Sequence, residues 1–262
     1  MSRPVGLIVG TGVDSVQLLT DTKSSSIKTP FGDVEYSLGT MDTAEVCVLK
    51  RHGEGHVVPP HLINYRANIM ALYMLGVKHV VTTSAVGSLQ SSLRPGSFAL
   101  MDGFLDFTKV RAQTFFETGM VVHTDMTHPY SRGITEVLAA EMTAMGLPVH
   151  EGAVYVSTEG PRFESPQEVR MYAAMGGSVV GMTGLPEVTL AREAGLDYQT
   201  IALITNYAAG ISPNLLTHKE VLDAMAAASA SLVEVLHRSL PHLADLASDS
   251  EGERPLDFLL QR

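Results

Sequence analysis

The stretch YQTIALITN (residues 198–206) decides the fold class, because it is a short apolar run with the length of one buried strand. Its centre, IALI at 201–204, has no polar interruption, which is typical of a strand covered on both faces by helices. The alanine-rich segment THKEVLDAMAAASASLVEVLHRSL (217–240) follows it and predicts a long helix. A buried strand that leads to a helix is the building unit of an α/β fold.

The same alternation extends along the chain in both directions from this stretch. Apolar runs predict strands at 5–9, 44–50, 79–87, 97–107 and 153–163, and SVVGMTGLPEVTLAREAG (178–195) predicts a strand, a turn and a helix. Helical spacing of apolar residues predicts helices at 64–76, 135–146 and 165–177, the last with Ser165 as its N-cap. We therefore expect a single-domain α/β fold over 1–240, with a mixed, mostly parallel central sheet flanked by helices and a polar C-terminal tail at 241–262.

Composition and charge exclude several classes of function. The net charge of −10 argues against general binding of nucleic acid or of an anionic membrane surface, because both need a basic face. A single cysteine cannot form an internal disulfide. Since the sequence also shows no signal peptide and no apolar stretch of membrane-spanning length, we expect a cytoplasmic protein.

Polar and small residues recur where the predicted strands end. In an open α/β sheet these ends form the ligand site. Hydroxyl groups, backbone N–H groups and an arginine that converge there favour an anion, most plausibly phosphate, to which an arginine can donate two parallel hydrogen bonds. The residues at the predicted strand ends are Gly10-Thr11-Gly12, Arg51-His52, Thr83-Ser84-Ala85, Phe163-Glu164, Met182-Thr183 and Asn206.

Each of these signals has a plain alternative when it is taken alone. GTG at 10–12 is also a common tight turn, and Arg51-His52 is also a common surface pair. The glycines lack the spacing of a dinucleotide fingerprint and of a P-loop. The nearest approach to a metal motif, HGEGH at 52–56, lies in a glycine-rich loop, so we interpret its histidines as hydrogen-bonded or solvated and expect no metal.

Taken together, the motifs resemble the purine nucleoside phosphorylase and methylthioadenosine phosphorylase family over roughly residues 5–225. The resemblance implies phosphorolysis of a purine nucleoside to the free base and a (deoxy)ribose 1-phosphate, with phosphate as co-substrate and no cofactor. It also implies a partly barrel-like sheet and a homotrimer. The motifs are GTG (10–12), TPFG (29–32), RHGEGH (51–56), NYRANIMAL (64–72), SAVGSL (84–89), EGPRFES (159–165), GMTGLPEVTLAREAG (181–195) and ITNYAAG (204–210).

The resemblance also implies a role for individual residues. Those that would hold phosphate are Thr11, Arg51, His52, Ser84, Ala85 through its backbone, and Thr183. Those that would contact the nucleoside are Phe163, Glu164, Met182, Asn206, Tyr207, Ala208 and His218, with His123 supplied by a neighbouring subunit. Three of these would act in catalysis, namely Asn206, His52 and Thr183.

The preferred nucleoside follows from TNYA at 205–208, where the methylthioadenosine branch has a TDYD pattern. The amide of Asn206 can donate to a 6-oxo oxygen, and Glu164 can accept from the protonated ring nitrogen of hypoxanthine or guanine. His218 matches the position that faces the ribose 5′-hydroxyl in relatives that cleave inosine. We therefore expect inosine or guanosine as substrate, with methylthioinosine or methylthioadenosine as the alternative. A binding protein without catalysis, or a nucleoside hydrolase that uses water, also stays open.

Overall fold

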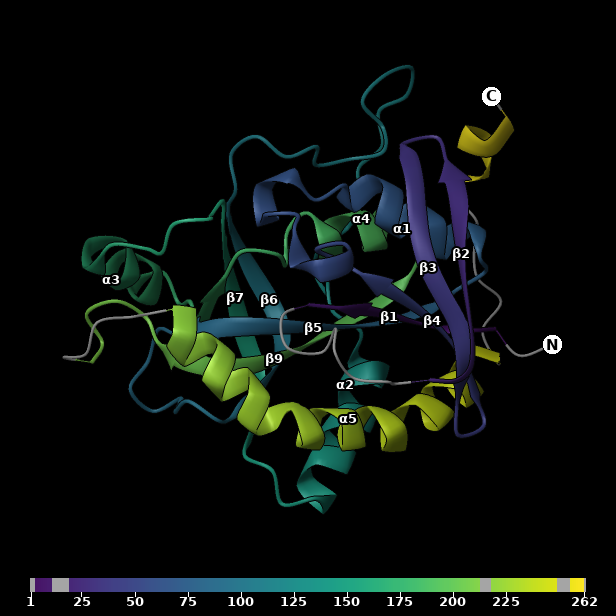
Figure 1. Ribbon diagram of the computed structural model, residues 1–262. Coiled ribbons are helices and arrows are strands. Elements are labelled where there is room, and N and C mark those ends of the chain that lie inside the picture. The colour runs from purple at the N-terminus through teal and green to yellow at the C-terminus, as the bar shows by residue number, and fades with distance from the viewer. Residues whose placement is uncertain (1–2, 11–18, 213–217, 249–254, 262) are drawn as a thin grey trace.

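A single mixed sheet organises the computed structural model, which describes residues 3–10, 19–212, 218–248 and 255–261 (Figure 1). Within these residues nine strands occur in the order β2-β3-β4-β1-β5-β8-β7-β6-β9. Their bounds are β1 (Val5–Val9), β2 (Thr20–Thr29), β3 (Gly32–Met41), β4 (Ala44–Lys50), β5 (His79–Ser88), β6 (Phe98–Phe107), β7 (Val149–Thr158), β8 (Val179–Gly181) and β9 (Asp197–Tyr207).

Part of this sheet closes on itself. β9 pairs with β6 and also runs parallel to β5 over the whole of both strands, from His79↔Asp197 to Ser88↔Tyr207. The strands β5, β8, β7, β6 and β9 thus form a barrel, and β1, β4, β3 and β2 extend from it as an open sheet. Pairing is parallel for β1–β4, β1–β5, β5–β9, β6–β7 and β7–β8, and antiparallel for the other pairs. The expectation of a mixed, partly barrel-like sheet is confirmed.

Helices cover both faces of the sheet (Figure 1). Leu7 on β1 packs into the core that also holds residues of α2 and α5, whereas the next residue, Ile8, packs into the core that holds α1 and α4. Successive side chains of a strand point to opposite faces, so a strand buried on both faces is a nearly continuous apolar run. The helices are α1 (Tyr65–Met74), α2 (Arg132–Ala144), α3 (Pro166–Ala174), α4 (Glu187–Glu193) and α5 (His218–Ser248).

Two parts of the structure differ from what the sequence predicts. The hairpin of β2 and β3 was not predicted, because most side chains of β2 are exposed and its serine-rich sequence carries no alternating apolar pattern. The expected start of a tail at residue 241 falls inside α5, which continues through Pro241 to Ser248. Leu240 and Leu243 are fully buried on either side of Pro241, and their packing outweighs the hydrogen bond that a proline removes from a helix.

The C-terminal residues that the structure describes return to the core. Leu256 is fully buried, and the carboxylate of Asp257 accepts a hydrogen bond of 2.9 Å from the hydroxyl of Tyr73 on α1. No helix in the described ranges is both long enough and apolar enough to cross a membrane.

Candidate active site

The site lies where β5 exchanges one neighbouring strand for another. The first half of β5 pairs with β1, up to Ile8↔Thr82, and its last residues pair with β8, at Gly87 and Ser88. Where strand order changes in this way a crevice opens beside the sheet. Gly10 after β1 and Arg51 after β4 therefore both meet the middle of β5, where each donates a hydrogen bond to Thr83. Sequence reasoning placed Ser84 and Asn206 beyond strand ends, but β5 and β9 continue past them because both strands go on to close the barrel.

A cavity of about 490 Å³ fills this crevice. Its volume suits a small organic ligand. Residues from the ends of β1 and β4, from β5, from the loop before α3, from the turn after β8 and from β9 all reach it. Of the site residues expected from the sequence, those that line it are Arg51, His52, Ser84, Ala85, Phe163, Glu164, Met182, Thr183, Asn206 and Ala208.

Two expected site residues do not line the cavity, and two have side chains outside the description. Tyr207 does not line the cavity, and its hydroxyl donates to the backbone oxygen of Ser91 at 3.3 Å. His123 is exposed on the long loop between β6 and α2 and does not reach the cavity of its own chain. Thr11 lies outside the described residues. The backbone of His218 begins α5, but its side chain is also outside the description; Val221, one turn further along, lines the cavity.

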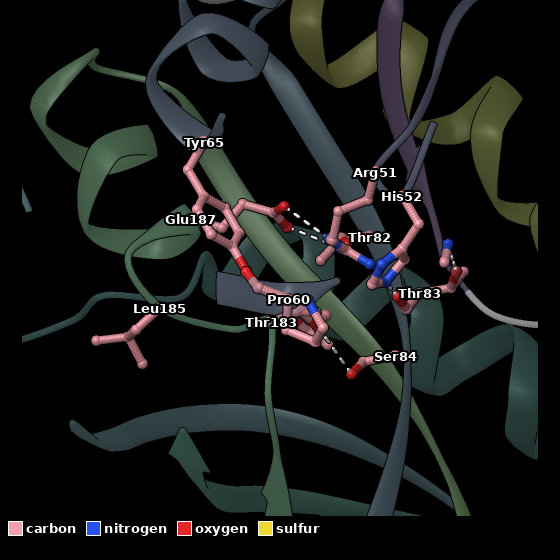
Figure 2. Close-up of polar contacts among 12 residues, drawn as sticks. Arg51, His52, Pro60, Tyr65, Thr82, Thr83, Ser84, Thr183, Leu185 and Glu187 are labelled. Atoms are coloured by element: carbon pink, nitrogen blue, oxygen red, sulfur yellow. Dashed lines mark hydrogen bonds and ion pairs between the residues drawn. The ribbon is translucent and has the colours of Figure 1, made fainter. Parts of the chain in front are cut away.

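Arg51 is held in a buried ion pair with Glu187 (Figure 2). Its Nε and Nη2 donate to the two carboxylate oxygens, each at 2.8 Å, and Tyr198 donates to the same carboxylate at 2.7 Å. Nη2 also donates to the hydroxyl of Thr82, and Nη1 donates to the backbone oxygen of Thr83 at 2.9 Å. Arg51 is 3% exposed and Glu187 is fully buried.

These bonds change what Arg51 can offer to an anion. A guanidinium has five N–H groups, and the contacts above occupy four of them, which leaves one on Nη1. A Cβ at Gly10 would lie 2.8 Å from Nη1, so a glycine is needed where the end of β1 passes this nitrogen. The sequence suggested that Arg51 makes a bidentate contact with phosphate. In the structure Arg51 makes that bidentate contact with Glu187, and one N–H of its guanidinium remains for a ligand.

Hydroxyl groups supply further donors beside Arg51. The hydroxyls of Ser84 and Thr183 lie 3.5 Å apart, and both residues are 7% exposed (Figure 2). The fully buried hydroxyl of Tyr155 lies 3.1 Å from Ser84 Oγ and is 3.5 Å from the backbone nitrogen of Thr183, which donates to it. When the Tyr155 hydroxyl donates a hydrogen bond to Ser84 Oγ, the hydroxyl of Ser84 can donate its own hydrogen bond to a ligand. This end of the cavity is therefore a cluster of neutral donors suited to a phosphate.

His52 is a neutral ring in this setting. Burial lowers the pKa of His52 to about 4, and the neighbouring Arg51 and His56 add to the decrease. Its Nδ1 lies 2.8 Å from the backbone oxygen of Val58 and must donate, since a carbonyl only accepts. Nε2 is left as an acceptor, able to bind a ribose hydroxyl or a protonated oxygen of phosphate. The ring stacks on that of His56, with centroids 4.1 Å apart.

The other end of the cavity combines a carboxylate with an amide. Glu164 is 8% exposed, and its Oε1 accepts from the hydroxyl of Thr158 at 2.7 Å. Asn206 is oriented by two contacts: Oδ1 accepts from the Thr205 hydroxyl at 2.8 Å, and Nδ2 donates to the backbone oxygen of Tyr207 at 3.0 Å. One N–H of the Asn206 amide stays free. Because both residues line the cavity, it offers a ligand a carboxylate acceptor and an amide donor.

Three residues with evident roles were missed by sequence reasoning. Glu187 could have been noticed as a lone carboxylate in the apolar segment LPEVTLA, because a charge at such a place needs a partner. Tyr155 and Arg111 carry no such signal. Arg111 is 9% exposed and joins walls of the cavity: it donates to the hydroxyl of Tyr65 at 3.1 Å, to the backbone oxygen of Thr158 at 3.1 Å and to that of Leu185.

Metal-ligating residues do not gather at this site. In the part of the chain that the structure describes, no three histidine, cysteine, aspartate or glutamate side chains lie together as ligands of a metal ion would.

Comparison with known proteins finds relatives over most of the chain. Residues 4–241 match the family model of the phosphorylase superfamily. A probable 6-oxopurine nucleoside phosphorylase of Moorella thermoacetica is 46% identical over 239 residues, which cover 90% of this chain and 92% of that protein. A probable S-methyl-5'-thioinosine phosphorylase of Methanothermobacter thermautotrophicus is 44% identical, covering 91% and 84%. The solved methylthioadenosine phosphorylase of Schistosoma mansoni in complex with adenine superposes with a TM-score of 0.88 at 30% identity, covering 98% and 95%.

Proposed function

The chain belongs to the phosphorylase superfamily, and on that premise we propose that it cleaves 6-oxopurine nucleosides with inorganic phosphate. It acts as a purine nucleoside phosphorylase, a pentosyltransferase that releases hypoxanthine or guanine and forms (deoxy)ribose 1-phosphate. Inorganic phosphate is its co-substrate. A relative of 46% identity with nearly full coverage is named for this activity, which supports the choice of base.

The observation that carries the proposal is that the buried carboxylate of Glu164 and the amide of Asn206 both line the cavity. The carboxylate accepts from the protonated ring nitrogen of a 6-oxopurine, and the amide donates to its 6-oxo oxygen or to the ring nitrogen beside it. Adenine carries no proton on that ring nitrogen, so it would set a lone pair against the carboxylate. Mispaired buried groups of this kind weaken binding by about 1–3 kcal/mol each.

Phosphate occupies the opposite end in this proposal. The Ser84 and Thr183 hydroxyls, the backbone of Ala85 and the free N–H of Arg51 hold it, and Thr11 adds a further hydroxyl. Cleavage of the glycosidic bond leaves a cation-like sugar and an electron-rich base. The phosphate stabilises the sugar and then attacks its anomeric carbon, while Asn206 donates to the departing base. Because Glu187 neutralises Arg51, the bound phosphate keeps more of its negative charge for the sugar.

The sugar lies between these two ends. Met182 packs on the ribose, Phe163 and Ala208 line the space around the base, and Nε2 of His52 accepts a hydrogen bond from a ribose hydroxyl. His218 faces the 5′-hydroxyl. A 5′-methylthio group is the second candidate at this position, because Val221 and the apolar side chains of Val57, Val58 and Pro60 also line the cavity. Methylthioinosine would keep the same base contacts, and a similar relative is named for that substrate.

Assembly and location complete the proposal. We propose a cytoplasmic homotrimer that works in purine salvage, in which His123 enters the site of a neighbouring subunit. The loop that carries His123 has exposed apolar residues, with Val121 at 83% and Val110 at 78% exposure. Contact with a neighbouring subunit would remove these side chains from water, which is favourable. Figure 1 shows that loop projecting from the body of the molecule above α1 and α4.

The test is base release from inosine, guanosine, adenosine, methylthioinosine and methylthioadenosine, each with and without phosphate. We expect inosine or guanosine to be cleaved fastest, release to require phosphate, and ribose 1-phosphate to accumulate in equal amount. Equal rates without phosphate would establish a hydrolase instead. Faster cleavage of methylthioinosine than of inosine would favour the second candidate, and preference for either adenine nucleoside would contradict the role given to Glu164.

A further inference from the structure

We propose that Thr158 is a specificity-determining residue, whose hydroxyl holds Glu164 as a hydrogen-bond acceptor and so commits the cavity to bases that carry a proton on the facing ring nitrogen. The inference rests on the proposed function and extends it to a residue that does not touch the ligand. Thr158 is the last residue of β7, it is 7% exposed, and it is absent from the cavity lining. It therefore contacts Glu164 from behind.

The contact is specific in direction. The hydroxyl of Thr158 lies 2.7 Å from Glu164 Oε1 and 3.4 Å from the backbone oxygen of Gly181. A hydroxyl has one proton, and a short bond to a carboxylate is stronger than a long bond to a carbonyl. Among the described residues, Thr158 is the one side chain that donates to Glu164. Oε1 thus already accepts one hydrogen bond, and in this proposal Oε2 is the oxygen that meets the base.

The protein framework fixes both partners in place. Thr158 pairs with Phe107 across β6 and β7, and its backbone oxygen accepts from Arg111 at 3.1 Å. Glu164 directly precedes Ser165, the N-cap of α3, whose capping box with Glu168 sets the start of that helix. Because strand pairing holds Thr158 and the capped start of α3 follows Glu164, removing the hydroxyl takes away the side-chain donor of Glu164 and leaves the hydrogen bond from its own backbone.

The consequence concerns the proton on Glu164. Burial raises the pKa of Glu164, and the hydrogen bond from Thr158 acts in the opposite direction. The other charged groups that act on this carboxyl are Glu168 on α3, which raises its pKa, and Arg162, which lowers it; Tyr172 on α3 is also near. Asn206, which faces the same cavity from β9, does not titrate. Without the Thr158 hydroxyl the pKa of Glu164 rises further, so the carboxyl takes up its proton at a higher pH and acts as a donor only below that pH.

A protonated Glu164 reverses the preference. It repels the protonated ring nitrogen of hypoxanthine or guanine and donates to the bare ring nitrogen of adenine. Thr158→Val keeps the shape of the side chain and removes only the donor. We expect kcat/KM for inosine to fall about tenfold while that for adenosine is unchanged or rises, which is the size of effect that one hydrogen bond to a charged group gives. Thr158→Ser restores the hydroxyl and should stay within about twofold of the wild type.

The pH profile separates this role from simple support of the fold. Activity on inosine requires ionised Glu164, so it is present above the pKa of that carboxyl and is lost as the pH falls through it. In Thr158→Val this acidic limb should move to higher pH, and it should not move in Thr158→Ser. If the acidic limb of the pH profile came from the titration of phosphate itself, it would lie at the same pH in the wild type, Thr158→Val and Thr158→Ser. Thr189→Val, which removes a hydroxyl that donates to the backbone of Pro186, serves as the matched control.

The experiment measures kcat/KM for inosine and adenosine from pH 5 to 9 in the wild type and these three variants, together with calorimetric binding of hypoxanthine and adenine. The proposal is supported if Thr158→Val alone shows a smaller ratio of kcat/KM for inosine to kcat/KM for adenosine and an acidic limb of the pH profile that moves to higher pH. Equal loss on both substrates with an unshifted limb, or a Thr158→Ser that behaves like Thr158→Val, would overturn it. If the wild type does not cleave inosine, the proposed function fails, and the ratio of the two base affinities in Thr158→Val against wild type still decides this inference.

Discussion

Replacing Glu187 with glutamine should destabilise the protein strongly and make bound phosphate the counter-ion of Arg51. Both partners are shielded from water, with Arg51 side-chain exposure at 2% and Glu187 at 0%. The substitution removes the charge that balances a buried guanidinium, and it places an amide N–H against a donor nitrogen of Arg51. Removing one partner of a buried ion pair costs about 3–5 kcal/mol. In a chain of this size each 1 kcal/mol lowers Tm by about 2–4 °C, so we expect a decrease of roughly 6–20 °C.

The assay is thermal unfolding in buffers that differ only in phosphate. A ligand that binds the folded state at 100 times its Kd adds about 2.7 kcal/mol of stability. In Glu187→Gln the phosphate becomes the counter-ion of Arg51, so the same phosphate concentration should raise Tm more in the variant than in the wild type. Chloride at equal ionic strength serves as the salt control.

A matched charge removal on the surface shows that the effect comes from burial. Lys219 and Asp223 form an ion pair on α5 with side-chain exposures of 81% and 64%. Asp223→Asn should change Tm by less than about 2 °C, because exposed pairs contribute little. A similarly small change in Glu187→Gln would refute the reasoning about the buried pair. If phosphate raised the Tm of wild type and Glu187→Gln equally, Arg51 would not belong to the anion site.

Three further outcomes are expected. Asn206→Asp should lower kcat/KM for inosine by about tenfold or more and lower that for adenosine less, because an acceptor replaces the donor and opposes the backbone oxygen of Tyr207; a uniform loss on both would contradict the base contact. The folded-state pKa of His52, about 4, is below its ordinary 6.5, so the unfolded chain takes up the proton first and stability falls as the pH drops from 6.5 to 4. In urea titrations at pH 7 and pH 5, His52→Asn should therefore show a smaller pH difference than the wild type, and an unchanged difference would refute this. Light scattering should give about three chains per particle, and Val121→Asp should shift the population to smaller particles; an active monomer would exclude the shared site.

The residues that could be predicted from the sequence are those whose role is visible locally. β1 was located because it is a short, almost entirely apolar run, and β9 because the four residues at its centre, 201–204, are all apolar. The start of α3 was located because Ser165 and Glu168 form a capping box within three residues of each other. The residue types of the candidate site were visible for a similar reason, since hydroxyls, an arginine and an amide stand out at the ends of apolar runs. Sequence could not locate β2, whose exposed serines have no buried face to mark them.

Only the tertiary structure decided which of these groups meet. Arg51 and Glu187 are 136 positions apart, and their ion pair exists because the end of β4 and the start of α4 reach the same side of β5. Thr158 and Glu164 are close in sequence, but the direction of the hydroxyl depends on how the loop before α3 folds back over β7. Local patterns record whether a residue is buried, because burial follows the period of its own strand or helix. Strand pairing between distant segments sets the partner and the direction of each contact. The same sequence pattern is compatible with a double hydrogen bond from Arg51 to a phosphate or to a carboxylate, and the fold directs that double contact to Glu187 and leaves one N–H of Arg51 for an anion.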